Sequence, residues 1–125
     1  MHENEIAKIV IDTSFTIHKE LGPGLLESVY EEIMYYELRK KHVNVERQKP
    51  VPVYWDNQEM GVGFRADLIV ERKLIVELKS VETVAPVHFK RLLTYLRILD
   101  LRLGLMINFN EALLKDGIRR VANNL

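Results

Sequence analysis

The 125-residue chain contains no cysteine. This absence excludes disulfide bonds, zinc–thiolate centres and thiol catalysis, and it suits a reducing cytoplasm. No apolar run approaches the roughly 18 residues of a membrane-spanning helix. The first ten residues carry three charged side chains and no apolar run, so they do not form a signal peptide. We therefore expect a cytoplasmic protein without a membrane partner.

The chain also lacks any excess of charge of one sign. It has 18 basic and 18 acidic residues, and its formal net charge is zero. Attraction to nucleic acid by bulk charge is therefore weak, although local basic patches are still possible. The length, with 47% apolar and 29% charged residues, predicts one globular domain over residues 1–125 with an ordinary hydrophobic core.

The pattern of apolar residues predicts a mixed α/β domain with the order α-α-β-β-β-α-β. The first helix is expected to end at Gly22-Pro23-Gly24, because glycine and proline both interrupt helices. The tail at 117–121 fits either a short strand or a helical turn. The expected helices are 5–21, 26–41 and 86–99, and the expected strands are 43–54, 63–70, 74–78 and 103–109.

Two apolar segments, 64–70 and 74–79, flank the short charged turn Glu71-Arg72-Lys73 and predict an antiparallel hairpin. If the turn is centred on Arg72, Asp67 faces Glu77. Directly opposed Cβ atoms lie roughly 4.5–5.5 Å apart, so the two carboxylates repel unless a cation lies between them. Mg²⁺ or Mn²⁺ would suit these oxygen ligands. Lys79 would project on the same side and could orient a phosphate.

Alternation along the hairpin assigns its side chains to two faces. The apolar face is expected to be core, and the other is apolar near the turn and charged at its far end. The alternative is a solvated charge cluster on a surface hairpin, and a register slip of one residue would move Asp67 to the opposite face. The apolar face carries Phe64, Ala66, Leu68, Val70, Leu74, Val76 and Leu78; the other carries Arg65, Asp67, Ile69, Ile75, Glu77 and Lys79.

These residues resemble a known motif. Asp67 followed by Glu77-Leu78-Lys79 is similar to the core motif of the PD-(D/E)XK nuclease superfamily. The segment Gly24-Leu25-Leu26-Glu27-Ser28-Val29-Tyr30 fits the signature of the GxxExxY protein family, which is placed in that superfamily. Segments that also resemble this family, in the same order, are 21–24, 76–79, 93–96 and 107–109. The likeness extends from about residue 9 to residue 121.

The resemblance implies a restriction-endonuclease-like core, which is a mixed sheet flanked by helices with the active site on its strands. It implies that Asp67, Glu77 and Glu27 bind Mg²⁺ or Mn²⁺ and that Lys79 is the catalytic lysine. The expected activity is hydrolysis of phosphodiester bonds in nucleic acid, with DNA as the expected substrate and a 5′-phosphate on the product. A homodimer would place two sites on one duplex.

Two alternatives stay open. The first is a catalytically inactive nuclease-like module that binds nucleic acid or a protein, since a fold does not guarantee an activity. Such a module could also be a subunit of a larger complex. The second concerns Glu27, because a negative charge is favoured near the start of a helix without any metal.

Five further residues are candidates for substrate contacts. Tyr30 lies on the same helix face as Glu27, although a packed tyrosine explains it equally well. Gln48 could border the cleft. His88, Arg91 and Tyr95 form a stripe on the helix after Lys79, which would contact phosphates or bases or would be the exposed flank of an amphipathic helix. Many members of the superfamily have a polar residue, often glutamine, on the helix after the lysine strand; here the candidate position holds Arg91, which leaves the contribution of this helix open.

Overall fold

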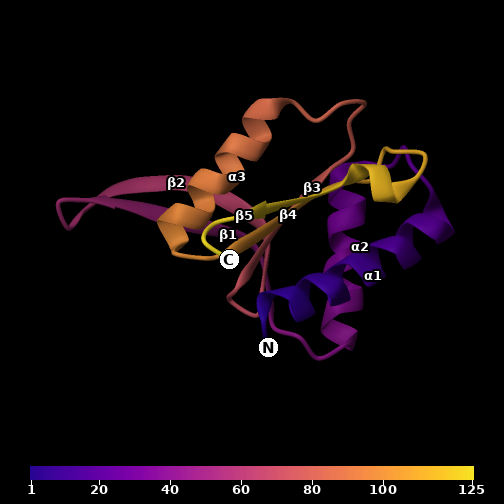
Figure 1. The fold of residues 1–125 in the computed structure, drawn as a ribbon, viewed down its shortest axis with the longest axis horizontal. Helices are drawn as coiled ribbons and strands as arrows, with labels where there is room; N and C mark the ends of the chain where they lie inside the picture. Colours follow the sequence, from indigo (N-terminus) through magenta and orange to yellow (C-terminus); the bar gives the residue numbers. More distant parts are fainter.

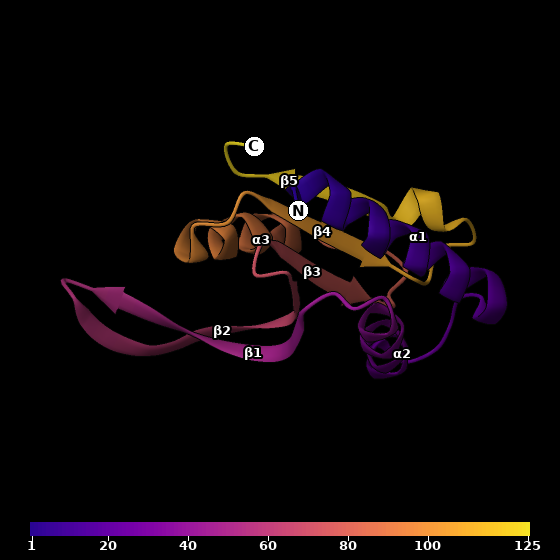
Figure 2. The ribbon, with the colours of Figure 1, turned by 90° about the horizontal axis from the view of Figure 1, so that it is seen from below.

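A five-stranded mixed sheet in the order β1-β2-β3-β4-β5 forms the centre of the computed structural model, which describes residues 1–125. Helices α1 and α2 lie on one side of the sheet and α3 lies on the other (Figures 1 and 2). All neighbouring strands are antiparallel except β3 and β4, which α3 connects as a crossover. The elements are α1 (Glu3–Leu21), α2 (Glu27–Lys40), β1 (Val45–Trp55), β2 (Gln58–Val70), β3 (Leu74–Lys79), α3 (Pro86–Leu99), β4 (Leu103–Asn108), the 3₁₀ turn η1 (Leu114–Gly117) and β5 (Ile118–Ala122).

The predicted order and fold class are confirmed. The tail, left open between a strand and a helical turn, contains η1 and then strand β5, which pairs with β4 at the edge of the sheet. Strand β2 begins at Gln58, five residues before the predicted start, because the β1–β2 hairpin is longer than its apolar pattern suggests. None of the helices combines the length and the apolar character needed to cross a membrane.

Both faces of the sheet are buried at its central strands, β3 and β4. On one face, α1 and α2 pack onto Leu68, Val76 and Leu105. On the other, Leu92 and Leu96 of α3 pack onto Ile69, Ile75 and Met106. Near-continuous apolar strands such as β3 and β4 are expected for a sheet covered on both sides.

The register of the β2–β3 hairpin agrees with a turn centred on Arg72. Leu68 pairs with Val76, Ile69 with Ile75 and Val70 with Leu74. The ladder stops at Leu68, one residue before Asp67. Beyond this point the backbone N–H of Leu78 donates to the Asp67 carboxylate at 2.9 Å instead of to a β2 carbonyl.

The predicted alternation of β2 is wrong at one end. Phe64 and Ala66 were assigned to the face of Leu68, but both lie in the core under α3, where Phe64 stacks on Tyr95 with ring centroids 3.8 Å apart. The change of face falls at Asp67. Opposite it in β1, Gln48 has a left-handed φ of 49°. The strict alternation assumed from the sequence therefore fails where both strands are locally irregular.

Beyond this irregularity β1 and β2 continue as a two-stranded arm that projects away from the rest of the molecule (Figures 1 and 2). Asp56 and Asn57 form its tip, and both have the positive φ that two-residue hairpin turns require. The arm exposes large apolar side chains, which are Tyr54, Trp55, Met60 and Val62.

Tyr30 of α2 is part of the core. Its side chain is fully buried and stacks on Phe109, with ring centroids 4.3 Å apart. Its hydroxyl donates to the carbonyl of Gly22 at 2.6 Å and accepts from the N–H of Leu25 at 3.2 Å. The tyrosine therefore fixes the loop that leads into α2. This geometry does not support the predicted substrate contact, because the hydroxyl is already used on both sides.

Replacement of Tyr30 by phenylalanine should lower the free energy of unfolding by about 1–3 kcal/mol, because it leaves the backbone groups of the loop without their partner. The matched control is Tyr36→Phe on the same helix. Tyr36 is 62% exposed, so this change should stay within about 0.5 kcal/mol. Urea denaturation of both variants measures the difference, and equal stabilities would contradict a structural role for the Tyr30 hydroxyl.

Candidate active site

The structure brings Asp67, Glu77 and Lys79 to one pocket at the end of the β2–β3 ladder. The stripe predicted on α3, which is His88, Arg91 and Tyr95, lines the same pocket. The complete lining is Arg65, Asp67, Glu77, Lys79, His88, Arg91, Tyr95 and Met106.

Glu77 is the most perturbed titratable group of this pocket. Its side chain is 8% exposed, and its Oε1 atom is buried without any hydrogen-bond partner. Burial, followed by the negative charge of Asp67 and a hydrogen bond with it, raises the pKa of Glu77 to about 9, while Lys79 opposes the shift. Glu77 therefore keeps its proton at neutral pH in the absence of a cation.

The two carboxylates fit a hard divalent cation. A buried oxygen without a partner is costly, and a cation bound there would satisfy it and favour the ionised form of Glu77. No group of three or more histidine, aspartate or glutamate side chains is placed to share one ion. Asp67 and Glu77 would thus be the two protein carboxylates of such a site, which suits Mg²⁺, since this ion usually keeps several waters.

Glu27 lies beside this pocket rather than within it. It is exposed at the start of α2, where it accepts a hydrogen bond from the Ser80 N–H at 3.3 Å. With Asp67 it lines a second pocket on the other side of that aspartate. The structure therefore places Glu27 near Asp67 but not in one cluster with both Asp67 and Glu77.

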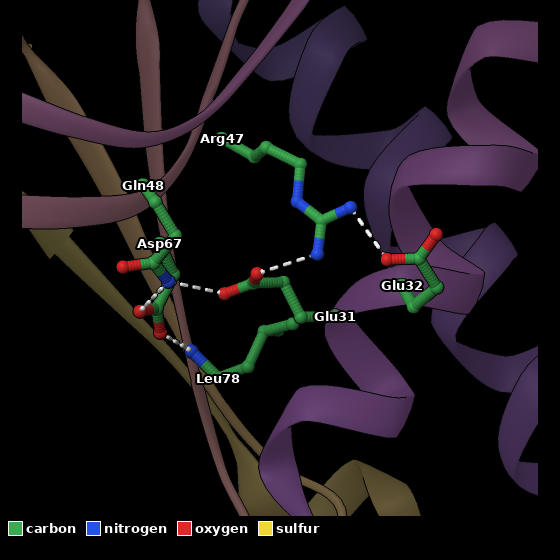
Figure 3. Close-up of polar contacts among 6 residues, drawn as sticks. All are labelled: Glu31, Glu32, Arg47, Gln48, Asp67 and Leu78. Carbon is green, nitrogen blue, oxygen red and sulfur yellow. Dashed lines mark hydrogen bonds and ion pairs between the residues drawn. The ribbon is translucent and has the colours of Figure 1, made fainter.

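Glu31 also lines this second pocket, and the sequence analysis missed it. It is buried, at 8% exposure, and it accepts hydrogen bonds from Arg47 at 3.1 Å and from Gln48 at 2.6 Å (Figure 3). Gln48 in turn reaches Asp67 at 3.3 Å. The available signal was spacing, because Glu31 follows Glu27 by four residues and so shares its helix face.

Burial and the charges of the pocket shift the pKa values of two residues of α3, His88 and Tyr95. Burial lowers the pKa of His88, and the nearby Lys79 and Arg91 lower it further. Burial and the negative charge of Glu77 raise the pKa of Tyr95. His88 is thus a neutral hydrogen-bonding group at neutral pH, and Tyr95 keeps its hydroxyl proton. Arg91 is exposed and stays free to meet an incoming anion.

The raised pKa of Glu77 predicts a specific pH dependence of stability. The unfolded chain loses the Glu77 proton near pH 4.5, whereas the metal-free folded protein retains it to about pH 9. The stabilisation is therefore complete below about pH 4.5 and is lost as the pH rises towards 9. Relative to Glu77→Gln, which does not titrate, the wild type should lose at most about 1.4 kcal/mol per pH unit in this window.

Urea denaturation from pH 5 to pH 8.5 in EDTA would measure this difference. Glu37→Gln, at a surface ion pair with Lys40 on α2, is the control and should run parallel to the wild type. Parallel curves for the wild type and Glu77→Gln would contradict the shift.

The comparison with known proteins agrees with this arrangement of strands and carboxylates. Residues 4–121 match the model of the PD-(D/E)XK nuclease superfamily, and this range includes all the residues of the candidate site. No curated protein and no solved structure matches the chain significantly. The match covers nearly the whole chain, and we conclude that the chain belongs to the PD-(D/E)XK nuclease superfamily.

Proposed function

We propose that the protein is a metal-dependent nuclease that hydrolyses phosphodiester bonds of nucleic acid, with DNA as the substrate. The observation that carries the proposal is the buried, unpartnered Oε1 of Glu77 beside Asp67, with Lys79 in the same pocket. A carboxylate pair of this kind is costly for stability alone, so a role in binding a cation explains it better.

Asp67 and Glu77 would hold Mg²⁺ or Mn²⁺, and Glu27 would act from the adjoining pocket, directly or through water. The bound ion would supply Lewis-acid stabilisation of phosphate charge and a more acidic water. Within the superfamily, we place the chain with the GxxExxY proteins, because Gly24, Glu27 and Tyr30 stand at the spacing of that signature.

The basic side chains of the pocket would recognise the phosphate. Lys79 lies two residues after Glu77 on β3, so it projects to the same side, and its ammonium would stabilise the charge that develops in the transition state. Arg91 and Arg65 are exposed at the rim, where they would bind the flanking backbone. His88 would donate or accept one hydrogen bond. Cleavage of this kind would leave a 5′-phosphate on the product.

We also propose that the protein acts as a homodimer, since two sites are needed to cut both strands of a duplex at once. The projecting arm supports this, because its exposed Trp55 and Met60 are unusual for a two-stranded hairpin in water. The arm carries Asp56 and Glu59 and no basic residue between 50 and 64, which favours a protein surface over a phosphate backbone as its partner.

The test of nuclease activity combines metal binding with cleavage. Calorimetry should detect micromolar to millimolar Mn²⁺ binding to the wild type, and it should be lost in Asp67→Asn and Glu77→Gln. With Mg²⁺ or Mn²⁺ present, plasmid and single-stranded DNA should be cleaved, and EDTA should stop the reaction. Lys79→Met should retain metal binding but cleave at least about 100-fold more slowly, because the charge on the phosphate is no longer stabilised.

Lys8→Met and Glu37→Gln are the matched controls, since both residues form surface ion pairs on helices away from the pocket. Their activity should equal that of the wild type. Unchanged cleavage by Glu77→Gln or Lys79→Met would overturn the assignment. Nucleic-acid binding that persists in EDTA, with no cleavage of either substrate, would instead identify a binding module on a nuclease fold.

Sedimentation equilibrium tests the dimer. The wild type should sediment as a dimer at micromolar concentration, and Trp55→Ser should shift it towards the monomer because the arm loses its largest exposed side chain. Tyr36→Ser, at another well-exposed aromatic residue away from the arm, should have no effect. A wild type that is monomeric at every concentration would contradict the proposal.

A further inference from the structure

Two side chains connect helix α2 to the candidate metal ligand Asp67. Glu31 of α2 accepts a hydrogen bond from Nε2 of Gln48 in β1 at 2.6 Å, and the same Nε2 donates to Oδ1 of Asp67 at 3.3 Å. Figure 3 shows that Gln48 lies between the two carboxylates, with its amide nitrogen directed at both. The chain of contacts therefore crosses from a helix to two strands.

The Glu31 carboxylate is fixed in place by its surroundings. It is buried, and a buried charge must be paired. Arg47 provides the pairing, because its guanidinium bonds Glu31 at 3.1 Å and the exposed Glu32 at 2.5 Å. Hydrogen bonds to these two glutamates, Glu32 first, raise the pKa of Arg47, whose guanidinium is positively charged throughout the ordinary pH range. Glu31 thus presents its other oxygen to Gln48 as a stationary acceptor.

The backbone of Gln48 shows that its position is imposed by this environment. Its φ of 49° is left-handed, a conformation that residues other than glycine, asparagine and aspartate seldom adopt. An amide placed between two carboxylates can also satisfy them only with its NH₂ group. The amide orientation of Gln48 is therefore determined by Glu31 and Asp67, and its backbone keeps a conformation that glutamine seldom adopts.

Asp67 is held from two directions as a result. Gln48 donates to its Oδ1, and the backbone N–H of Leu78 donates to its Oδ2 at 2.9 Å. Leu78 lies beyond the last residue pair of the β2–β3 ladder, so its N–H is free for this contact. Each carboxylate oxygen of Asp67 thus accepts a hydrogen bond from a different neighbouring strand.

We propose that Glu31 and Gln48 are positioning residues that fix the Asp67 carboxylate in the orientation needed to bind the cation. In this role both residues would act through Asp67, without a contact of their own to the cation or the substrate. Their functional effect rests on the nuclease activity proposed above, whereas their effect on the geometry of Asp67 does not. Removal of a residue that hydrogen-bonds to a metal ligand commonly lowers metal affinity or activity by about 10–100-fold.

The test uses Gln48→Met and Glu31→Met, which keep the side-chain length and remove the donor or the acceptor. Crystal structures of both variants should show Asp67 turned away from its wild-type orientation. Mn²⁺ affinity by calorimetry should fall by about 10-fold or more. The kcat for DNA cleavage should fall, while KM stays within about 2-fold, because no substrate contact is lost.

The double variant separates positioning from general destabilisation. If Glu31 acts through Gln48, the variant that carries both Glu31→Met and Gln48→Met should lose no more Mn²⁺ affinity than Gln48→Met alone. Glu37→Met on the same helix is the control and should leave affinity unchanged. Glu31→Gln, which still offers an oxygen to Gln48, should recover most of the affinity lost in Glu31→Met.

Two outcomes would overturn the proposal. One is an Asp67 side chain that keeps its orientation in both methionine variants. The other is additive losses of affinity in the double variant. A wild type that binds no Mn²⁺ and cleaves nothing would overturn the proposed nuclease function alone, since the crystal structures of the variants would still decide whether Gln48 and Glu31 hold Asp67.

Discussion

The removal of Glu77 from water beside Asp67 is the constraint on which the rest of the site depends. A carboxylate in a low-dielectric interior with a second carboxylate near it either keeps a proton or binds a cation. The surrounding structure creates this situation. Strand β3 is covered by α1 and α2 on one face and by α3 on the other, so Glu77 is only 8% exposed, in the pocket that α3 also lines. The parallel pairing of β3 with β4 requires this crossover helix, and the crossover supplies His88, Arg91 and Tyr95.

Much of this arrangement follows from the sequence, because it depends on patterns of apolar residues within short segments of the chain. The two apolar segments around Arg72 have nearly equal length, so only one register buries both, and that register sets Asp67 close to Glu77. The stripe on α3 follows from helical spacing in the same way. The helices and strands were predictable because each has one dominant period of apolar residues.

What the sequence did not predict depends on contacts between distant segments. The face of Phe64 and Ala66 changes because β1 and β2 are irregular at Gln48 and Asp67, and the alternation of residues contains no sign of a left-handed glutamine. Glu31 resembles any charged residue of an amphipathic helix until Arg47 and Gln48 are placed against it. The GxxExxY spacing suggested one functional unit, whereas in the structure Glu27 is exposed beside Asp67 and Tyr30 is a core residue.

The β1–β2 arm also affects how the outer surface of the molecule is placed relative to the candidate site. The strands that form the arm continue directly into the segment that carries Gln48 and Asp67, so the base of the arm is part of the candidate site. Its ladder changes register between Val51 and Pro52 and again before Tyr54, and such interruptions make a ribbon bend locally. The direction of the outer arm is therefore set separately from that of the strands that carry Gln48 and Asp67. A contact surface around the exposed Trp55 can thus vary in position between related chains without any change at the carboxylates.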